Sequence, residues 1–182
     1  MKEAQKTDRK LGTEQKKVGS SGKYLTFSLC SQLYGIPTSH VTEIIRMQKP
    51  TFLPNLPDYI KGVINLRGKV VPVIDMRLRF REKTKAWDSH TSIVIVEDGE
   101  NTAGLIVDSV EDVRNVEEDR ITGAPKPRKN TGGFVRGIAT LEGGSAMLLD
   151  LTKVLSAGSL EEKTENGEEN ERGSGDAGRP SP

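Results

Sequence analysis

The chain has 182 residues, of which 34% are hydrophobic and 29% are charged, and its formal net charge is +1. No apolar run approaches the roughly 20 residues of a membrane span, and the N-terminus lacks the apolar segment of a secretion signal, so we expect a cytoplasmic protein that is not inserted in a membrane. The near-zero net charge and the low share of aromatic residues, 4%, argue against nucleic-acid binding.

Both ends of the chain are poor in aliphatic side chains. Residues 1–22 contain scattered basic residues, and residues 158–182 are rich in Glu, Gly and Ser, with no apolar periodicity after Leu160. Neither segment can bury enough apolar surface to offset the entropy of ordering it. We therefore expect a disordered basic tail at 1–22, a folded domain at 23–157 and a disordered acidic tail at 158–182.

The folded part begins with an alternating segment, Leu25 to Leu29, which predicts a half-buried strand. It ends at Cys30, the only cysteine, which cannot form an internal disulfide and which we expect to be a half-buried strand residue. Downstream, apolar segments flank short turns rich in Gly, Asn, Asp and Glu, and this pattern predicts β-hairpins. The paired segments are 62–66 with 70–74, 93–96 with 103–107, and 134–141 with 146–149.

Four single residues in this part of the chain have specific expected roles. Pro72 cannot donate to a strand ladder, so its strand should bulge or lie at an edge there. Asp75 and Asp150 each precede a short apolar stretch and are placed to cap the N-terminus of a short helix. The lone tryptophan, Trp87, lies in a polar loop, and we expect it to pack over the core.

The chain contains an internal repeat. Residues 59–75 align without a gap on residues 134–150, with an aromatic residue at the start, a shared Gly-x-x-x-Leu-x-Gly pattern and a final Asp. Earlier positions match as well: Gly35-Ile36 with Gly104-Leu105, Val41 with Val110, Glu43 with Asp112, and Ile44 with Val113. We expect a duplication, with repeat one at about 23–80 and repeat two at about 91–155, each of about five short strands, the size of an SH3-like or OB-like barrel. The expected fold class is all-β with a few short helices.

Known catalytic motifs are absent from the sequence. It has no Gly-rich phosphate loop, no Cys or His cluster at metal-ligand spacing and no nucleophile elbow, so we expect no catalytic residue, no metal and no cofactor. Two alternatives to a protein-binding module stay open. One is an OB-like module that binds single-stranded nucleic acid, and the other is an unrecognised hydrolase that uses Asp or Glu.

The stretch from Gly62 to Asp75, which reads GVINLRGKVVPVID, resembles the signature of the CheW family, as do the segments 41–44, 56–62 and 104–108. The likeness covers about residues 23–155 in one register. It implies two five-stranded SH3-like or OB-like barrels that exchange strands around a shared core. It also implies a non-enzymatic adaptor that couples chemoreceptors to a CheA-type histidine kinase in chemotaxis, recruited to membrane-associated receptor arrays and monomeric when free.

The resemblance also implies two binding surfaces. The cytoplasmic tip of a chemoreceptor is expected in the groove between the barrels, at Val41, Glu43, Ile44, Asn65, Leu66, Arg67 and Gly68. The regulatory domain of the kinase is expected at the loop that starts at residue 121, with Ile121, Thr122 and Pro125, although Thr122-Gly123 replaces a more typical basic residue and proline.

One charge difference separates the two repeats. The first repeat has Glu43 and Arg67, of opposite charge, where the second has Asp112 and Glu142, of the same charge. If the fold alone required an ion pair at these positions, both repeats should have one. We therefore expect Glu43 to orient Arg67 as a receptor-facing group, the alternative being an ordinary surface salt bridge.

Overall fold

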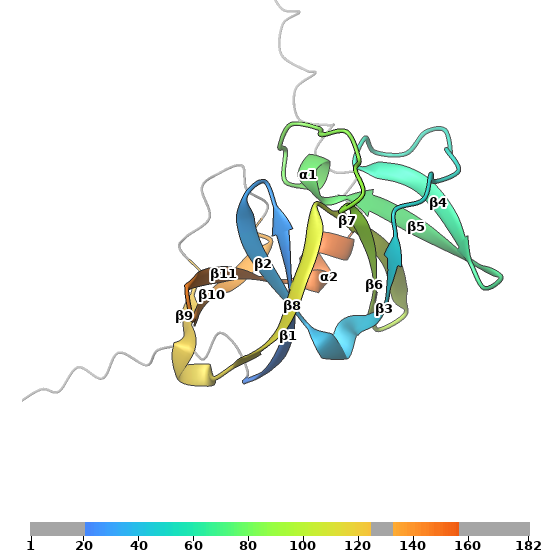
Figure 1. Ribbon diagram of the computed structural model, residues 1–182. Helices are drawn as coiled ribbons and strands as arrows, with labels where there is room; N and C mark the ends of the chain where they lie inside the picture. Colours follow the sequence, from blue (N-terminus) through green and yellow to red (C-terminus); the bar gives the residue numbers. More distant parts are fainter. Residues whose placement is uncertain (1–20, 125–132, 157–182) are drawn as a thin grey trace, which may run out of the picture.

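The structure is a computed structural model that describes residues 21–124 and 133–156 (Figure 1). The predicted tails, except for Ser21 and Gly22, lie outside the described residues. The first half of the described chain contains β1 (Gly22–Leu29), β2 (Gln32–Pro37), η1 (Thr38–His40), β3 (Val41–Arg46), β4 (Ile60–Leu66), β5 (Lys69–Asp75) and α1 (Met76–Arg79). The second half contains β6 (Ser92–Asp98), β7 (Asn101–Val107), β8 (Ser109–Val116), η2 (Glu118–Arg120), β9 (Ile121–Gly123), β10 (Val135–Leu141), β11 (Gly144–Leu149) and α2 (Leu151–Leu155).

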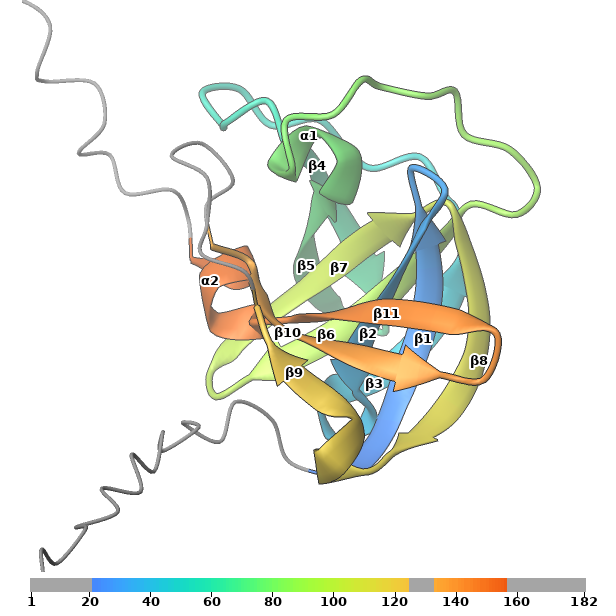
Figure 2. The same cartoon turned by 90° about the vertical axis from the view of Figure 1, so that its left-hand side faces the viewer.

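The strands form two mixed sheets, and each sheet contains strands from both halves of the chain. One has the order β8-β1-β2-β11-β10-β9 and the other β3-β6-β7-β5-β4. The two sheets lie side by side in Figure 1, and Figure 2 views the molecule from the side of the six-stranded sheet. The all-β fold with strand exchange between the halves is therefore confirmed, and the three-residue β9 adds a sixth strand to one sheet.

Strand register shows that the halves are equivalent. In the first half Ile60 pairs with Ile74 and Gly62 with Val73, with a register shift between these two pairs. The hairpin of the second half has the same pairs and the same shift 75 positions later, Val135 with Leu149 and Gly137 with Leu148. Even the closing backbone bond is repeated, from Asp75 N to Tyr59 O at 2.7 Å and from Asp150 N to Phe134 O at 2.8 Å. The duplication predicted from the sequence is thus present in the strand pairing.

Both predicted helix caps form. The Asp75 carboxylate accepts hydrogen bonds from Arg77 N at 3.0 Å and Leu78 N at 3.3 Å at the start of α1. The Asp150 carboxylate accepts one from Lys153 N at 3.3 Å at the start of α2. Each cap satisfies backbone N–H groups that have no partner within the helix.

Two single-residue expectations need correction, and a third is met in part. Cys30 is half-buried, but it lies in the β1–β2 turn with a φ of +53° rather than in a strand, and burial raises the pKa of its thiol. Trp87 does not pack over the core. It lies in the loop that follows α1, and 41% of its surface is exposed. Pro72 lies in β5, which is an inner strand and not an edge strand of its sheet. However, β5 pairs with β7 only from Val73 onward, so Pro72 lies before the start of that ladder and is not required to donate to it.

The apolar core has three parts. The largest cluster lies between the sheets and draws buried residues from both halves, such as Phe27, Ile36 and Ile74 with Val94 and Leu105. Two smaller clusters lie on the faces of the sheets that turn away from the central cluster: Ile64, Val71, Val73, Ile93, Ile95 and Ile106 in the five-stranded sheet, and Tyr24, Val116, Ala139 and Leu148 in the six-stranded sheet. Because every cluster contains residues of both halves, neither half can bury its apolar surface alone.

We expect the two halves to unfold in one cooperative transition, since splitting the chain near Lys85 would expose all three clusters at once. Far-ultraviolet circular dichroism and Trp87 fluorescence should give coincident thermal curves. Two separated transitions, or an isolated residue 21–85 fragment with dispersed amide signals, would contradict this expectation.

Candidate functional site

The β4–β5 turn is built to present one side chain. Arg67 and Gly68 have φ values of +52° and +87°, the two left-handed residues of a tight type I′ hairpin turn. Asn65 stabilises the turn, because its Oδ1 accepts a hydrogen bond from Gly68 N at 2.9 Å. The result is an Arg67 side chain that is 80% exposed on a backbone with little freedom to move.

Glu43 holds this arginine from the opposite edge of the sheet. It is on β3, whereas β4 is the other edge strand of the five-stranded order. Arg67 Nη2 donates to Glu43 Oε1 at 3.0 Å, so the pair joins the two edges of the curled sheet. Beneath it, Ile45 and Leu66 pack against the buried cluster of this sheet. The pair therefore combines a structural position at the barrel closure with an exposed guanidinium.

The other expected receptor residues divide into three groups. Asn65 and Gly68 are exposed at the turn, beside Arg67. Val41 packs against the central cluster and Leu66 against the cluster of the five-stranded sheet, so each presents little side chain to a partner. Ile44 is 45% exposed, but strand alternation points it away from the face of Glu43. The structure brings Glu43, Asn65, Arg67 and Gly68 together and separates Ile44 from them.

The equivalent place in the second half has a different arrangement. Asp112 Oδ2 lies 3.4 Å from Arg114 Nε, a neighbour on the same strand. The β10–β11 turn contains Glu142 and Gly143, and only Gly143 has a positive φ, +88°. Two acidic groups cannot form the link between sheet edges that Glu43 and Arg67 make. The charge asymmetry in the sequence is thus a real difference between the two barrels.

The residues expected to face the kinase lie at an edge of the six-stranded sheet. Ile121 and Thr122 are in β9, the terminal strand of the order. Ile121 packs partly against the small cluster of this sheet, and Thr122 is exposed, with its Oγ1 donating to Ile138 O at 3.3 Å. Pro125 lies outside the described residues. Among the described residues, no strand pairs with the outer edge of β9, so this edge offers backbone groups to a partner strand.

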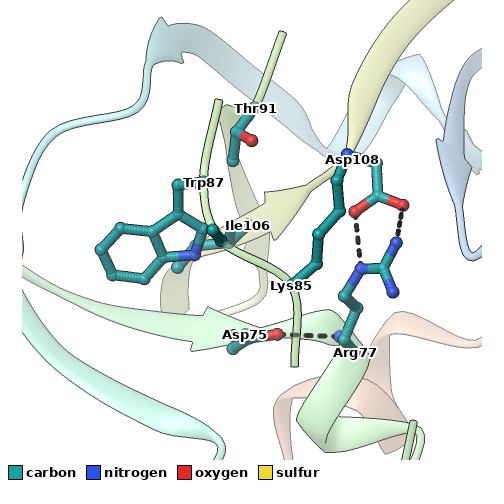
Figure 3. Close-up of a pocket in the computed structure, with 8 residues that line it drawn as sticks. Asp75, Arg77, Lys85, Trp87, Thr91, Ile106 and Asp108 are labelled. Atoms are coloured by element: carbon teal, nitrogen blue, oxygen red, sulfur yellow. Dashed lines mark hydrogen bonds and ion pairs between the residues drawn. The ribbon is translucent and has the colours of Figure 1, made fainter. Parts of the chain in front are cut away.

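A bidentate ion pair that was not predicted from the sequence joins the halves near α1 (Figure 3). Arg77 Nε donates to Asp108 Oδ1 at 2.7 Å and Arg77 Nη2 donates to Asp108 Oδ2 at 2.5 Å. Cys30 N also donates to Asp108 Oδ2, at 2.9 Å. Burial alone would raise the pKa of Asp108, but the hydrogen bonds from Arg77 and Cys30 outweigh it and hold that pKa below its usual value.

Asp108 should therefore contribute to stability above about pH 4, the ordinary aspartate range. Because its pKa in the folded protein is lowered, this contribution is lost as the pH falls below that range. We expect Asp108→Asn to destabilise the protein by about 2 kcal/mol at pH 7 and by much less at pH 3. Urea unfolding at both pH values tests this, and an equal loss at both would contradict it.

A second feature not predicted from the sequence is the set of contacts made by Arg79. The Arg79 guanidinium carbon is 4.5 Å from the Tyr59 ring centroid and 4.6 Å from that of Phe134. The same guanidinium donates to carbonyl oxygens at the end of α2, those of Val154 at 3.1 Å and Ser156 at 2.7 Å. Tyr59 and Phe134 are matched positions of the repeat. This match was the feature of the sequence from which their closeness in the fold could have been predicted. The cluster links the last turn of the second half to the first half.

The described part of the chain contains neither a metal-ion cluster nor a membrane-spanning helix. Within 21–124 and 133–156, no group of three or more His, Cys, Asp or Glu residues could hold a metal ion. In the same part of the chain no helix is long and apolar enough to cross a membrane. The notable features are an exposed, oriented arginine and an exposed strand edge, which are features of a protein interface.

A family model described as the CheW-like domain matches residues 23–159. The chain belongs to the CheW family. The matched segment includes both repeats, the Arg67 turn and β9, so both candidate surfaces lie within the CheW-like domain.

Individual CheW proteins agree with this assignment. The chain is 34% identical to chemotaxis protein CheW of Klebsiella aerogenes over 136 residues, which cover 74% of this chain and 82% of that protein. It is 36% identical to chemotaxis protein CheW of Bacillus subtilis over 134 residues, covering 73% and 86% respectively. The crystal structure of scaffolding protein TtCheW from Thermoanaerobacter tengcongensis matches with a TM-score of 0.71 and 34% identity, over 76% of this chain and 94% of that chain.

Proposed function

We propose that this chain is a non-enzymatic scaffold that couples chemoreceptors to a CheA-type histidine kinase. Support comes from its membership in the CheW family and from the similarity to the scaffolding protein TtCheW. In this role the protein acts in the cytoplasm, at receptor arrays, and performs no chemistry itself. Its task is to hold two partners at a fixed distance.

The observation that carries the receptor part of the proposal is the exposed Arg67. A long cationic side chain normally loses entropy when a partner immobilises it. Here the left-handed turn and Glu43 Oε1, at 3.0 Å, already limit its freedom. An oriented guanidinium can donate two parallel hydrogen bonds to a carboxylate or to backbone oxygens of a receptor helix. We assign Glu43, Asn65, Arg67 and Gly68 to the receptor surface, with Glu43 as the positioning residue.

The kinase part of the proposal rests on β9. The outer edge of β9, which is terminal in the sheet formed by the described strands, and the exposed Thr122 offer hydrogen-bond groups beside the partly buried Ile121. A domain of the same barrel type could dock there with its own strand edge or turn. Two different surfaces, one on each sheet, allow one scaffold to contact both partners at once.

Reconstitution tests the proposed function. The full chain is mixed with the cytoplasmic fragment of a receptor and the CheA-type kinase from the same organism, and the complex is sedimented while kinase phosphorylation is followed with labelled ATP. We expect receptor-dependent kinase activity only when the chain is present. Unchanged kinase activity with no co-sedimentation would reject the proposal, as would capture of single-stranded DNA that weakens steeply with salt.

A further inference from the structure

A shallow pocket lies outside both candidate surfaces, between the loop that follows β3 and the loop that follows α1. It encloses about 420 Å³ and is lined by Lys49, Pro50, Phe52, Lys61, Asp75, Thr84, Lys85, Ala86 and Trp87. Figure 3 shows the adjoining smaller pocket, where Trp87 and Lys85 reach out from the second loop. Two aromatic side chains are poorly covered here, because Phe52 is 75% and Trp87 is 41% exposed.

Three lysines line the pocket, and only one of them has an acidic partner among the described residues. Lys85 pairs with Asp88 at 2.9 Å. No acidic group of the described residues lies within ion-pair distance of Lys49 or Lys61. The only carboxylate in the lining, that of Asp75, is buried and accepts the hydrogen bonds that cap α1. An occupant should therefore carry apolar and acidic groups together.

The segment of the chain beyond the described residues has that composition. After Ser156 the sequence reads AGSLEEKTENGEENE, in which Leu160 is followed at once by Glu161 and Glu162. Between Leu160 and Glu171 there are six Glu residues and one Lys. The basic segment at the other end of the chain has the same sign as the pocket and would be repelled from it.

The origin of this acidic segment is close to the pocket. Ser156 O accepts a hydrogen bond from Arg79 Nη2 at 2.7 Å, and the Arg79 guanidinium carbon is 4.5 Å from the centroid of the Tyr59 ring. Tyr59 is two residues before Lys61 in the pocket wall. An extended chain covers about 3.3 to 3.6 Å per residue, so the four to six residues from Ser156 to Glu162 span roughly 13 to 22 Å. That length exceeds the separations from Ser156 O to Arg79 and from Arg79 to the Tyr59 ring, which lead toward Lys61 in the pocket wall.

We propose that Leu160–Glu162 of this chain docks in the lysine-lined pocket, with Leu160 against Phe52 and Trp87 and the two glutamates beside Lys49 and Lys61. Because the acidic segment and the pocket belong to the same chain, even a weak contact between them is populated. A short flexible linker gives an effective concentration in the millimolar range, so a contact with a millimolar dissociation constant is occupied about half of the time. The docked segment shields the aromatic side chains from solvent and from other proteins.

Trp87 is the only tryptophan of the chain, so its fluorescence reports directly on the pocket. We expect removal of residues 157–182 to increase acrylamide quenching of Trp87 about twofold. Glu161→Gln combined with Glu162→Gln should give the same increase, and so should 1 M NaCl, because salt screens exposed pairs. Glu168→Gln combined with Glu169→Gln is the matched control and should change little, as should removal of residues 1–20.

A charge exchange keeps the test independent of folding. Lys49→Glu with Lys61→Glu should expose Trp87, and adding Glu161→Lys with Glu162→Lys should restore its protection. Thermal melting confirms that each variant is folded. The proposal is overturned if truncation leaves quenching unchanged in the folded protein, or if the exchange restores nothing. Protection that depends on protein concentration and survives truncation would also overturn it, because a second copy would then be the occupant.

Discussion

Gly62→Ala is expected to destabilise the protein by about 4 kcal/mol, because two costs combine at this position. Gly62 has a φ of +129°, a backbone conformation that residues with a side chain rarely adopt. In addition, a Cβ atom at this position would lie 2.1 Å from Thr51 O. That oxygen belongs to backbone and cannot rotate away. It also accepts the hydrogen bond from Val63 N at 2.9 Å that attaches the Thr51 segment to β4.

Chemical denaturation measures this loss, and Gly68→Ala is its control. Gly68 also has a positive φ, +87°, but no atom lies within 4 Å of its added Cβ. Gly68→Ala should therefore cost only about 1 kcal/mol, the conformational part alone. Since small domains are stable by about 5 to 15 kcal/mol, Gly62→Ala should leave a large unfolded fraction in a marginal protein. Equal effects of the two substitutions would show that the contact with Thr51 O is relieved by movement of the loop.

Arg67→Ala is expected to weaken assembly with receptor and kinase about thirtyfold, which corresponds to roughly 2 kcal/mol, a usual cost for removing an arginine anchor. The fold should lose no more than about 0.5 kcal/mol, because Arg67 is 80% exposed and the broken bond with Glu43 is a surface ion pair. Titration of the receptor fragment, together with a thermal melt of each variant, separates the two effects.

Glu142→Ala is the matched control for Arg67→Ala. Glu142 occupies the same turn position in the second half and belongs to neither candidate surface. It should leave both assembly and melting temperature nearly unchanged. Normal assembly by folded Arg67→Ala protein would exclude Arg67 from the receptor surface, and loss of folding would show that the barrel closure depends on its pair with Glu43.

The repeat could be predicted from the sequence because it lies in residues whose backbone roles are specific. A glycine at the register shift and an aspartate at the helix cap occur once in each half. The positions of Val41 and Ile44 relative to Glu43 were harder to predict. Exposure alternates along β3, with Val41 and Glu43 half-buried and Ile44 exposed, but which face is covered depends on the pairing with β6, and the sequence of β3 alone does not specify that pairing.

The missed contacts share one physical cause. Arg77 with Asp108, and Arg79 with Tyr59 and Phe134, join residues that are 20 or more positions apart in the sequence. Their partners are chosen by how the two sheets meet, which no local pattern specifies. Trp87 is the opposite case. Its type predicts burial, but a loop with several charged residues keeps it at the surface.

The exchange of strands between sheets has a consequence for the origin of the chain. β3 pairs with β6 and β8 pairs with β1, so a polypeptide of one repeat could complete its sheet only with a second copy of itself. Such an ancestor would have been a domain-swapped homodimer, stable only above a threshold concentration. Two copies joined in one chain need no such threshold, and each surface is then free to differ, as Arg67 in one turn and Glu142 in the other do.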